Sequence, residues 1–212
     1  MAKWIHSFIQ LEEPINSEAL LLKIEKACRT CYRSEDNIKE GSAEKLIKSC
    51  IARGHESVLE HASITYRVIC DRAISHEWVR HRLAAYSQES SRYCNYCKDK
   101  FNNELTFIYP WWYDGNENNS LWDSLVIAGE VAELQYQTMI SSGATPDMAR
   151  SVLPNCTKTE LVVTMNIREL RHFIKLRTTK AAHPDIRKLA TELLKTLQDN
   201  GLGVLFYDIE VG

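Results

Sequence analysis

Apolar positions along the chain recur at two different spacings, which predict two kinds of element. Ile64, Tyr66, Val68 and Cys70 alternate with polar residues, which is typical of a strand that is buried on one face. From residue 184 to residue 200, apolar residues are instead three and four positions apart, as in an amphipathic helix. The chain therefore combines strands with helices.

Capping residues and glycines mark the predicted ends of the helices. Asn166 with Glu169 three positions later is a capping-box pattern, and Pro146 follows Thr145 where a proline fits the first helical turn. Helices are predicted from the cap Ser17, from Ser42 to Gly54, over 72–85, 121–143 and 145–154, after Asn166, and from Pro184 to Gly201. Strands are predicted at 4–10, 62–71, 159–165 and 203–207, and a loop is predicted at 115–120.

The order of these elements indicates the fold class. Strands are interleaved with helices at irregular intervals, and the sequence has no internal repeat or Pro/Gly-rich linker. This pattern predicts an α+β fold in which helices pack on a mostly antiparallel sheet. Because 212 residues is an ordinary length for one domain, we expect a single domain over residues 1–212.

Composition and charge narrow the classes of function. The chain is 44% hydrophobic and 25% charged with a formal net charge of −2, which argues against binding nucleic acid through bulk electrostatics. No apolar run approaches the ~20 residues of a membrane span, and the first residues lack the pattern of a signal peptide. Seven cysteines without secretory features are expected to be reduced thiols in the cytoplasm. We expect neither nucleic acid nor membrane as a partner.

Two cysteine pairs, Cys28–Cys31 and Cys94–Cys97, have the spacing of zinc ligands, so a site of four thiolates is one alternative. The first pair, however, lies inside an apolar periodic segment, where cysteine serves as a small buried hydrophobe. The histidines and glutamates of residues 54–61 do not follow a compact ligand pattern such as HExxH. We therefore expect no metal.

The stretch RHRLAAYSQESSRY (80–93) concentrates arginines and serines in an acidic chain. On a regular helix Arg80 and Arg82 point about 200° apart, so either the helix ends here or the two residues serve different ligands. The serines and Arg92 could present hydroxyls and a bidentate guanidinium to a phosphate. The alternative is a solvated face with surface salt bridges, although arginine rather than lysine favours anion recognition. Ser90 is predicted to hold an anion rather than attack as a nucleophile, because no group that would orient a neighbouring base is apparent.

A second basic cluster lies in MNIRELRHFIKLR (165–177). Arg168, His172 and Lys175 are four and three positions apart, so they share one face of the predicted helix. From this pattern alone, an ordinary amphipathic helix with basic surface residues is an equally good interpretation.

Together these stretches resemble the flavin-dependent thymidylate synthases. Arg-His-Arg followed after seven residues by Ser90 is similar to the family signature, and GHESVLEHASITY, ARSVLPNCTKTELVVTMNIRELRHFIKLR and AAHPDIR extend the resemblance over about residues 20–200. It implies a homotetramer with shared active sites that converts dUMP to dTMP. The carbon donor would be 5,10-methylenetetrahydrofolate, with FAD as the hydride donor and NADPH as the reductant of the flavin. The alternatives are a flavoprotein that methylates another pyrimidine nucleotide and a non-catalytic nucleotide-binding protein.

The resemblance also assigns roles to positions. Arg177 matches the arginine that polarises the pyrimidine ring, and it would act catalytically by stabilising negative charge on the uracil. Flavin contacts are implied for Ser57, Arg80, His81, Arg82, Gln88, Asn166, Arg168 and His172. Substrate contacts are implied for His55, Glu77, Arg80, Gln88, Ser90, Ser91, Arg92, Arg150 and Arg177. Of these, His55 falls near the flavin and folate side.

Overall fold

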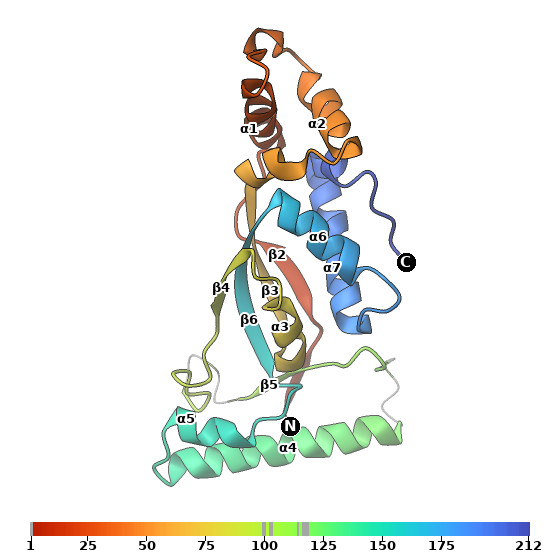
Figure 1. Cartoon of the computed structure of the whole chain (residues 1–212). Coiled ribbons are helices and arrows are strands. Elements are labelled where there is room, and N and C mark those ends of the chain that lie inside the picture. Colours follow the sequence, from red (N-terminus) through yellow and green to blue (C-terminus); the bar gives the residue numbers. More distant parts are fainter. Residues whose placement is uncertain (1, 99–100, 102–103, 114, 116–118) are drawn as a thin grey trace. The chain divides into compact units, whose positions relative to one another are not determined.

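The structure is a computed structural model that describes residues 2–98, 101, 104–113, 115 and 119–212. Its helices are α1 (Ser17–Thr30), α2 (Ser42–Ala52), α3 (Arg72–Trp78), α4 (Ser120–Ser141), α5 (Pro146–Ala149), α6 (Ile167–Arg177) and α7 (Pro184–Leu197) (Figure 1). Its strands are β1 (Lys3–Ile5), β2 (Phe8–Leu11), β3 (Ser63–Asp71), β4 (Ala84–Gln88), β5 (Thr106–Ile108) and β6 (Lys158–Asn166). Short 3-10 turns include η2 (Glu56–His61), η4 (Arg150–Val152) and η6 (Gly203–Leu205).

Four of the strands form one sheet in the order β2–β3–β6–β4, and β1 pairs in parallel with β5. At one end of the β3–β6 pair, the amide of Ile167 donates to the carbonyl of Ala62, and at the other end the amide of Arg72 donates to that of Thr157. One residue number falls as the other rises, so these two strands are antiparallel. The predicted α+β fold with a mostly antiparallel sheet is confirmed.

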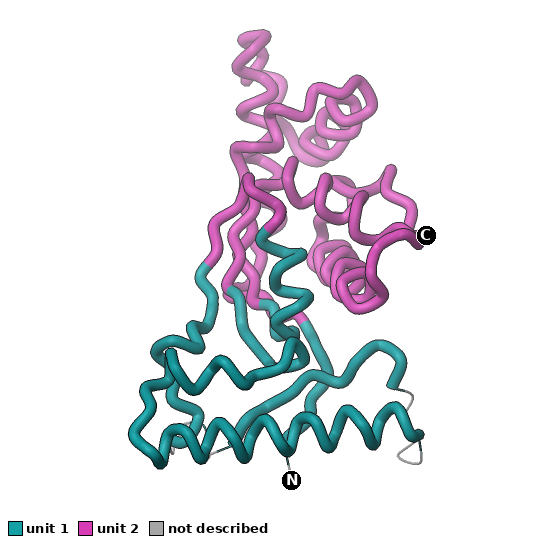
Figure 2. Tube along the Cα trace, turned by 60° about the horizontal axis from the view of Figure 1, so that its bottom comes forward, with its two compact units in different colours: residues 1–8, 68–79, 87–161 teal, residues 9–67, 80–86, 162–212 magenta. Residues whose placement is uncertain are grey.

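The chain divides into two compact units, shown in teal and magenta in Figure 2. The first unit contains residues 1–8, 68–79 and 87–161, and the second contains residues 9–67, 80–86 and 162–212. The division passes through β2, β3, β4 and β6, so each of these strands contributes residues to both units. A single domain over residues 1–212 stays a prediction.

Aromatic and aliphatic side chains form the core of the first unit. The buried members are Tyr96, Leu105, Phe107, Tyr136 and Ala149. Gly129 of α4 faces this core, and a Cβ atom there would lie 3.2 Å from the ring of Trp4. The missing side chain therefore allows α4 to approach β1 and β5 closely.

In the second unit, α6 packs against α7 and α1 packs against α2. The apolar face predicted for the last helix is buried in α7, namely Ile186, Leu189, Ala190, Leu193, Leu194 and Leu197. Leu170, Phe173 and Ile174 of α6 are fully buried as well. Each such side chain contributes about 2 kcal/mol to folding, so this packing fixes the position of the polar face of α6. Among the described residues, no helix combines the length and the apolarity needed to cross a membrane.

Three predicted elements were wrong. The strand predicted at 4–10 is two strands, because β1 pairs with β5 and β2 pairs with β3. The helix predicted over 72–85 ends at Trp78, because residues 84–88 join the sheet as β4. The strand predicted at 203–207 is a 3-10 turn, and the guanidinium of Arg171 binds the carbonyl of Leu205 there.

The capping predictions were largely correct. Asn166 caps α6 by accepting a hydrogen bond from the amide of Glu169 at 2.9 Å. The cap of α1, however, is Asn16 and not Ser17, since the side chain of Asn16 accepts from the amide of Ala19. Of the predicted loop at 115–120, residues 116–118 lie outside the described residues.

Candidate functional site

A cavity of about 580 Å³ in the second unit lies along the polar face of α6. Its size is within the usual range for ligand sites, about 300–1,000 Å³. The cavity is lined by Glu56, Glu60, Leu83, Asn166, Arg168, Glu169, Arg171, His172 and Lys175. Asn166, Arg168 and His172 are predicted flavin contacts, so the structure brings these three together. Arg168, His172 and Lys175 share one face of the helix, as their spacing predicted.

The N-terminus of α6 contributes to the electrostatics of this cavity. Asn166, which caps the helix, is one of the lining residues. The first amides of a helix carry partial positive charge, which favours an anion at this end. Arg168 in the first turn and Lys175 further along the helix add full positive charges to the same lining. This set of donors suits an anionic ligand with hydroxyl groups, because the carboxylates of the lining can accept hydrogen bonds from hydroxyls.

The two arginines of the cavity differ in how strongly they are held. Arg168 binds Glu60 at 2.6 Å, but about half of each side chain is exposed (52% and 46%). Such a pair is worth at most about 1 kcal/mol. Arg171 is buried, and its guanidinium forms two hydrogen bonds with Asp208 at 2.8 and 2.9 Å and a third with Glu56 at 3.1 Å. Arg168 is therefore available to a ligand, whereas Arg171 anchors the C-terminal segment.

The pKa of Asp208 reflects this anchoring. Its hydrogen bonds with Arg171 and the positive charge of that guanidinium lower the pKa of the carboxyl from 3.8 to about 2. The Nε atom of Arg171 is buried and has no hydrogen-bond partner among the residues that the structure describes. The other guanidinium nitrogens are thus satisfied by carboxylates and a carbonyl.

Two side chains of α6 and one from the turn between α3 and β4 form a hydrogen-bonded relay beside the cavity. The Nδ1 atom of His81 lies 3.2 Å from Oε1 of Glu169, and Nε of Arg177 donates to Nε2 of His81 at 3.1 Å. Because the Nε–H of arginine can only donate, Nε2 of His81 must be unprotonated. The ring proton then sits on Nδ1, where it is donated to the carboxylate. His81 is therefore a neutral imidazole with a defined tautomer.

The surroundings of His81 fix both its charge and its position. Burial, the adjacent guanidinium of Arg177 and the neighbouring His172 lower the pKa of His81 to about 4. Burial raises the pKa of Glu169 above its usual range. The ring of Phe173 contacts the imidazole edge-on at a centroid distance of 4.9 Å, and the hydroxyl of Tyr86 donates to the backbone carbonyl of His81 at 2.7 Å.

Two residues of the relay, together with His172, also have the spacing of a metal site. Ligand atoms of His81, Glu169 and His172 all lie within 4.8 Å of one another. Both ring nitrogens of His81 are nevertheless engaged in hydrogen bonds, and a metal ion would face the charge of Arg177. We therefore interpret His81 and Glu169 as members of the hydrogen-bonded relay with Arg177 and not as metal ligands. The cysteine pairs do not form a metal cluster within the described part of the chain, where Cys28 instead lies 3.7 Å from Cys50.

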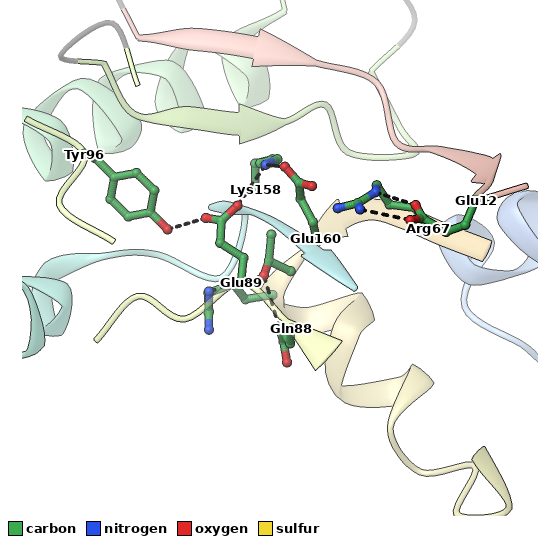
Figure 3. Close-up of polar contacts among 9 residues, drawn as sticks. Glu12, Arg67, Gln88, Glu89, Tyr96, Lys158 and Glu160 are labelled. Atoms are coloured by element: carbon green, nitrogen blue, oxygen red, sulfur yellow. Dashed lines mark hydrogen bonds and ion pairs between the residues drawn. The ribbon is translucent and has the colours of Figure 1, made fainter. Parts of the chain in front are cut away.

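In the first unit, Gln88 and Glu89 are held by an ordered set of polar contacts (Figure 3). The amide nitrogen of Gln88 donates to the hydroxyls of Ser75 and Thr159 at 3.1 and 3.2 Å. Glu89 accepts from the hydroxyl of Tyr96 at 2.6 Å and from a lysine of β6. The start of the serine segment is thereby fixed to the sheet.

Beyond Glu89, the serine and arginine positions belong to the same unit. Ser91 is buried, whereas Arg92 is exposed, and the hydroxyl of Ser90 accepts from the amide of Arg92 at 3.3 Å. Arg92 and Arg150 both lie close enough to Asp147 to contribute, after its hydrogen bond with Thr145, to lowering the pKa of that carboxyl. Two predicted substrate arginines thus act electrostatically on the same carboxylate.

The predicted substrate contacts are divided between the units. His55, Arg80 and Arg177 belong to the second unit. The remaining predicted contacts lie in the first unit, namely Glu77, Gln88, Ser90, Ser91, Arg92 and Arg150. The predicted flavin contacts Ser57, Arg80 and Arg82 are exposed, Ser57 in η2 and the two arginines in the turn after α3. The helix α3 ends at Trp78, before Arg80 and Arg82. Of the two explanations for these divergent arginines, the structure therefore supports the end of the helix at this point.

The structure adds residues to the site that the sequence did not single out. Glu169 was interpreted only as part of a capping box, yet its side chain bonds His81. Arg171 lies four positions after Ile167 and three before Ile174, both buried. A charged residue in that apolar register is a signal of a buried ion pair, and it could have revealed the role of Arg171.

Comparisons with known proteins indicate the family to which the chain is similar. A model of the family described as thymidylate synthase complementing protein matches residues 17–200. The flavin-dependent thymidylate synthase of Pyrococcus furiosus is 37% identical over 166 residues, which cover 77% of this chain and 66% of that protein, just under two thirds of its length. The enzyme of the same name from Geobacter sulfurreducens is 36% identical over 180 residues, covering 81% of this chain and 75% of that protein.

A third relative and one solved structure extend the comparison. The flavin-dependent thymidylate synthase of Mycobacterium avium is 34% identical over 206 residues, covering 89% of this chain and 79% of that protein. The crystal structure of a UMP/dUMP methylase PolB from Streptomyces cacaoi, bound with 5-Br dUMP, is similar with a TM-score of 0.78 and 25% identity, covering 97% of this chain and 95% of that one. The chain therefore belongs to the flavin-dependent thymidylate synthase family of methyltransferases.

Proposed function

We propose that this protein converts dUMP to dTMP by reductive methylation, with 5,10-methylenetetrahydrofolate as the carbon donor, FAD as cofactor and NADPH as the reductant of the flavin. The observation that carries the proposal is Arg177, whose guanidinium is oriented by a neutral histidine that also bonds Glu169 of the cavity lining. The family match and the relatives named flavin-dependent thymidylate synthase support the same reaction.

The chemistry of the cavity fits a flavin dinucleotide. Arg168, Lys175 and the α6 N-terminus would hold its phosphates, and Glu56 and Glu60 would accept hydrogen bonds from its hydroxyl groups. When bound, FAD supplies the reducing equivalents for the methylation. The further flavin contacts in this proposal are Ser57, Arg80, His81, Arg82, Gln88, Asn166 and His172.

For the nucleotide, the proposal assigns binding and electrostatic roles to this chain. Ser90, Ser91, Arg92 and Arg150 would hold the phosphate through hydroxyls and guanidinium groups. Arg177 would face the uracil and stabilise the negative charge that develops on it, without transferring a proton. Contacts from His55, Glu77, Arg80 and Gln88 complete the proposed substrate site.

We further propose a homotetramer with shared active sites and a cytoplasmic location. The tetramer is proposed by analogy with the family. The location is supported by the seven cysteines, all of which are free thiols.

The proposal can be tested on the purified protein with FAD. We expect the yellow absorbance of an oxidised flavin and, with dUMP, methylenetetrahydrofolate and NADPH, release of tritium from C5 of the pyrimidine. Arg177→Lys should lower turnover by about a hundredfold and retain the flavin, because lysine lacks the Nε–H that His81 orients. The matched control is Arg53→Lys, an exposed arginine that binds Ser49, and it should change neither quantity. Protein that binds no FAD would exclude the proposed function.

A second substrate has support from one comparison. The similar structure from Streptomyces cacaoi is a UMP/dUMP methylase, so the ribonucleotide UMP is a candidate as well. The same tritium assay with dUMP and UMP side by side decides between them. Release from UMP at a rate equal to or above that from dUMP would replace dUMP as the assigned substrate.

A further inference from the structure

The relay of Glu169, His81 and Arg177 connects the two ends of α6. Neither the lining of the cavity nor the capping box of the helix requires such a connection. Glu169 is buried in the first turn of α6, and Arg177 is the last residue of the same helix. His81, which enters from the turn between α3 and β4, joins the two side chains by a hydrogen bond to each. A carboxylate at one end of the helix is thus connected to a guanidinium at the other.

The direction of the hydrogen bonds in this connection determines which ring nitrogen of His81 carries the proton. An imidazole with its proton on Nε2 would present a donor to the Nε–H of Arg177, and two donors facing each other repel. Only the tautomer with the proton on Nδ1 offers Arg177 an acceptor. Glu169 favours that tautomer because its carboxylate accepts the Nδ1 proton at 3.2 Å.

The relay also has little freedom to rearrange. His81 is 5% exposed, and Phe173 and His172 pack against its ring. A rotated or flipped imidazole would have to displace these neighbours.

We propose that Glu169 is a positioning residue for Arg177: its carboxylate keeps the His81 proton on Nδ1, and the lone pair left on Nε2 orients the Nε–H of Arg177. The role of Arg177 toward the nucleotide rests on the proposed function. The tautomer of His81 does not depend on the proposed function, so the positioning role and the proposed function can be tested separately.

Two substitutions at Glu169 separate the hydrogen bond from simple packing. Glu169→Gln keeps an oxygen that can accept the Nδ1 proton, whereas Glu169→Leu has similar volume and no acceptor. We expect Glu169→Leu to lower kcat for tritium release by about tenfold to a hundredfold, the usual effect of losing an outer hydrogen-bond partner. The KM for dUMP and the flavin absorbance should remain within about twofold, and Glu169→Gln should restore most of the activity.

The path through His81 is tested by combining variants. In a His81→Gln background the amide oxygen can accept from Arg177 without any tautomer, so Glu169→Leu should have little additional effect on kcat. Glu12→Gln, which alters a surface pair with Arg67 at 2.7 Å, is the control and should leave kcat unchanged. Independent, multiplicative effects of the Glu169 and His81 variants would overturn the proposal.

Nitrogen-15 NMR of the histidine side chains gives a readout that needs no turnover. With His81→Gln used to assign the signals, the native protein should show a protonated Nδ1 and an unprotonated Nε2, and Glu169→Leu should shift the ring toward protonated Nε2. An unchanged tautomer together with native kcat in Glu169→Leu would refute the positioning role. If the native protein shows the expected tautomer but no methylation, the relay stands and the proposed function fails.

Discussion

Replacing Asp208 by asparagine removes the negative charge that binds Arg171 to the C-terminal segment. The fall of the Asp208 pKa from 3.8 to about 2 corresponds to about 2–3 kcal/mol, at about 1.4 kcal/mol per pKa unit. Since 30% of this side chain is exposed, solvent screening reduces that contribution to about 1 kcal/mol. The buried Arg171 keeps Glu56 as a partner but loses its bidentate one, so we expect Asp208→Asn to lower the free energy of unfolding by about 1–3 kcal/mol at neutral pH.

The pH dependence of that difference gives the sharper test. A carboxyl whose pKa is depressed in the folded state contributes its stability fully above its unfolded value of 3.8, and the contribution is lost as the pH falls toward 2. The stability difference between native protein and Asp208→Asn should therefore be constant above about pH 5 and narrow below about pH 4. Urea unfolding at several pH values measures it, with Glu210→Gln as an exposed control expected within about 0.5 kcal/mol of the native protein. Equal stability at neutral pH, or a difference that does not narrow in acid, would refute the reasoning.

Three further substitutions test local features of the fold. Gly201→Ala should destabilise by about 1–3 kcal/mol in thermal unfolding, because Gly201 has φ +81° and a Cβ there would lie 2.8 Å from Oγ of Ser17; full native stability would contradict this. Asn166→Ala should cost about 1 kcal/mol in urea unfolding by removing the cap of α6, and it should also weaken FAD binding in a fluorescence titration. Tyr96→Phe should cost about 1 kcal/mol in the same unfolding assay, since Glu89 loses its 2.6 Å hydrogen bond; an unchanged midpoint would show that this bond has no net effect.

Local signals in the sequence predicted the elements whose stability is decided locally. The apolar spacing of α7 and the cap of α6 were predicted correctly because each depends on residues within one or two turns of each other. The strand β4 was missed for the opposite reason. Residues 84–88 have no clear alternation of their own, and they become a strand through pairing with β6, about seventy positions away in the sequence.

The candidate site also combines features that local spacing predicts with features that depend on residues far apart in the sequence. The shared face of Arg168, His172 and Lys175 could be predicted, since helical spacing alone places them together. The bond between Arg177 and His81 joins residues 96 positions apart, and no periodicity encodes it. Even the resemblance to a family, which assigned both residues to ligands, gave no reason for them to contact each other. The sequence thus assigned roles to single side chains, but it carried no signal of the hydrogen bonds that orient them.

The cavity also explains how an acidic chain can offer cations to an anionic ligand. Glu60 neutralises Arg168 in an exposed pair worth at most about 1 kcal/mol, so a phosphate can displace it at little cost. Arg171, in contrast, is buried and bound by two carboxylates, and releasing it would leave a desolvated charge. Lys175 is held with a strength between those of Arg168 and Arg171, since it binds Asp208 at 3.2 Å with 45% of its side chain exposed. Ligand binding should therefore exchange the partner of Arg168 first and leave Arg171 in place, so that α6 keeps its position while its outer face changes partners.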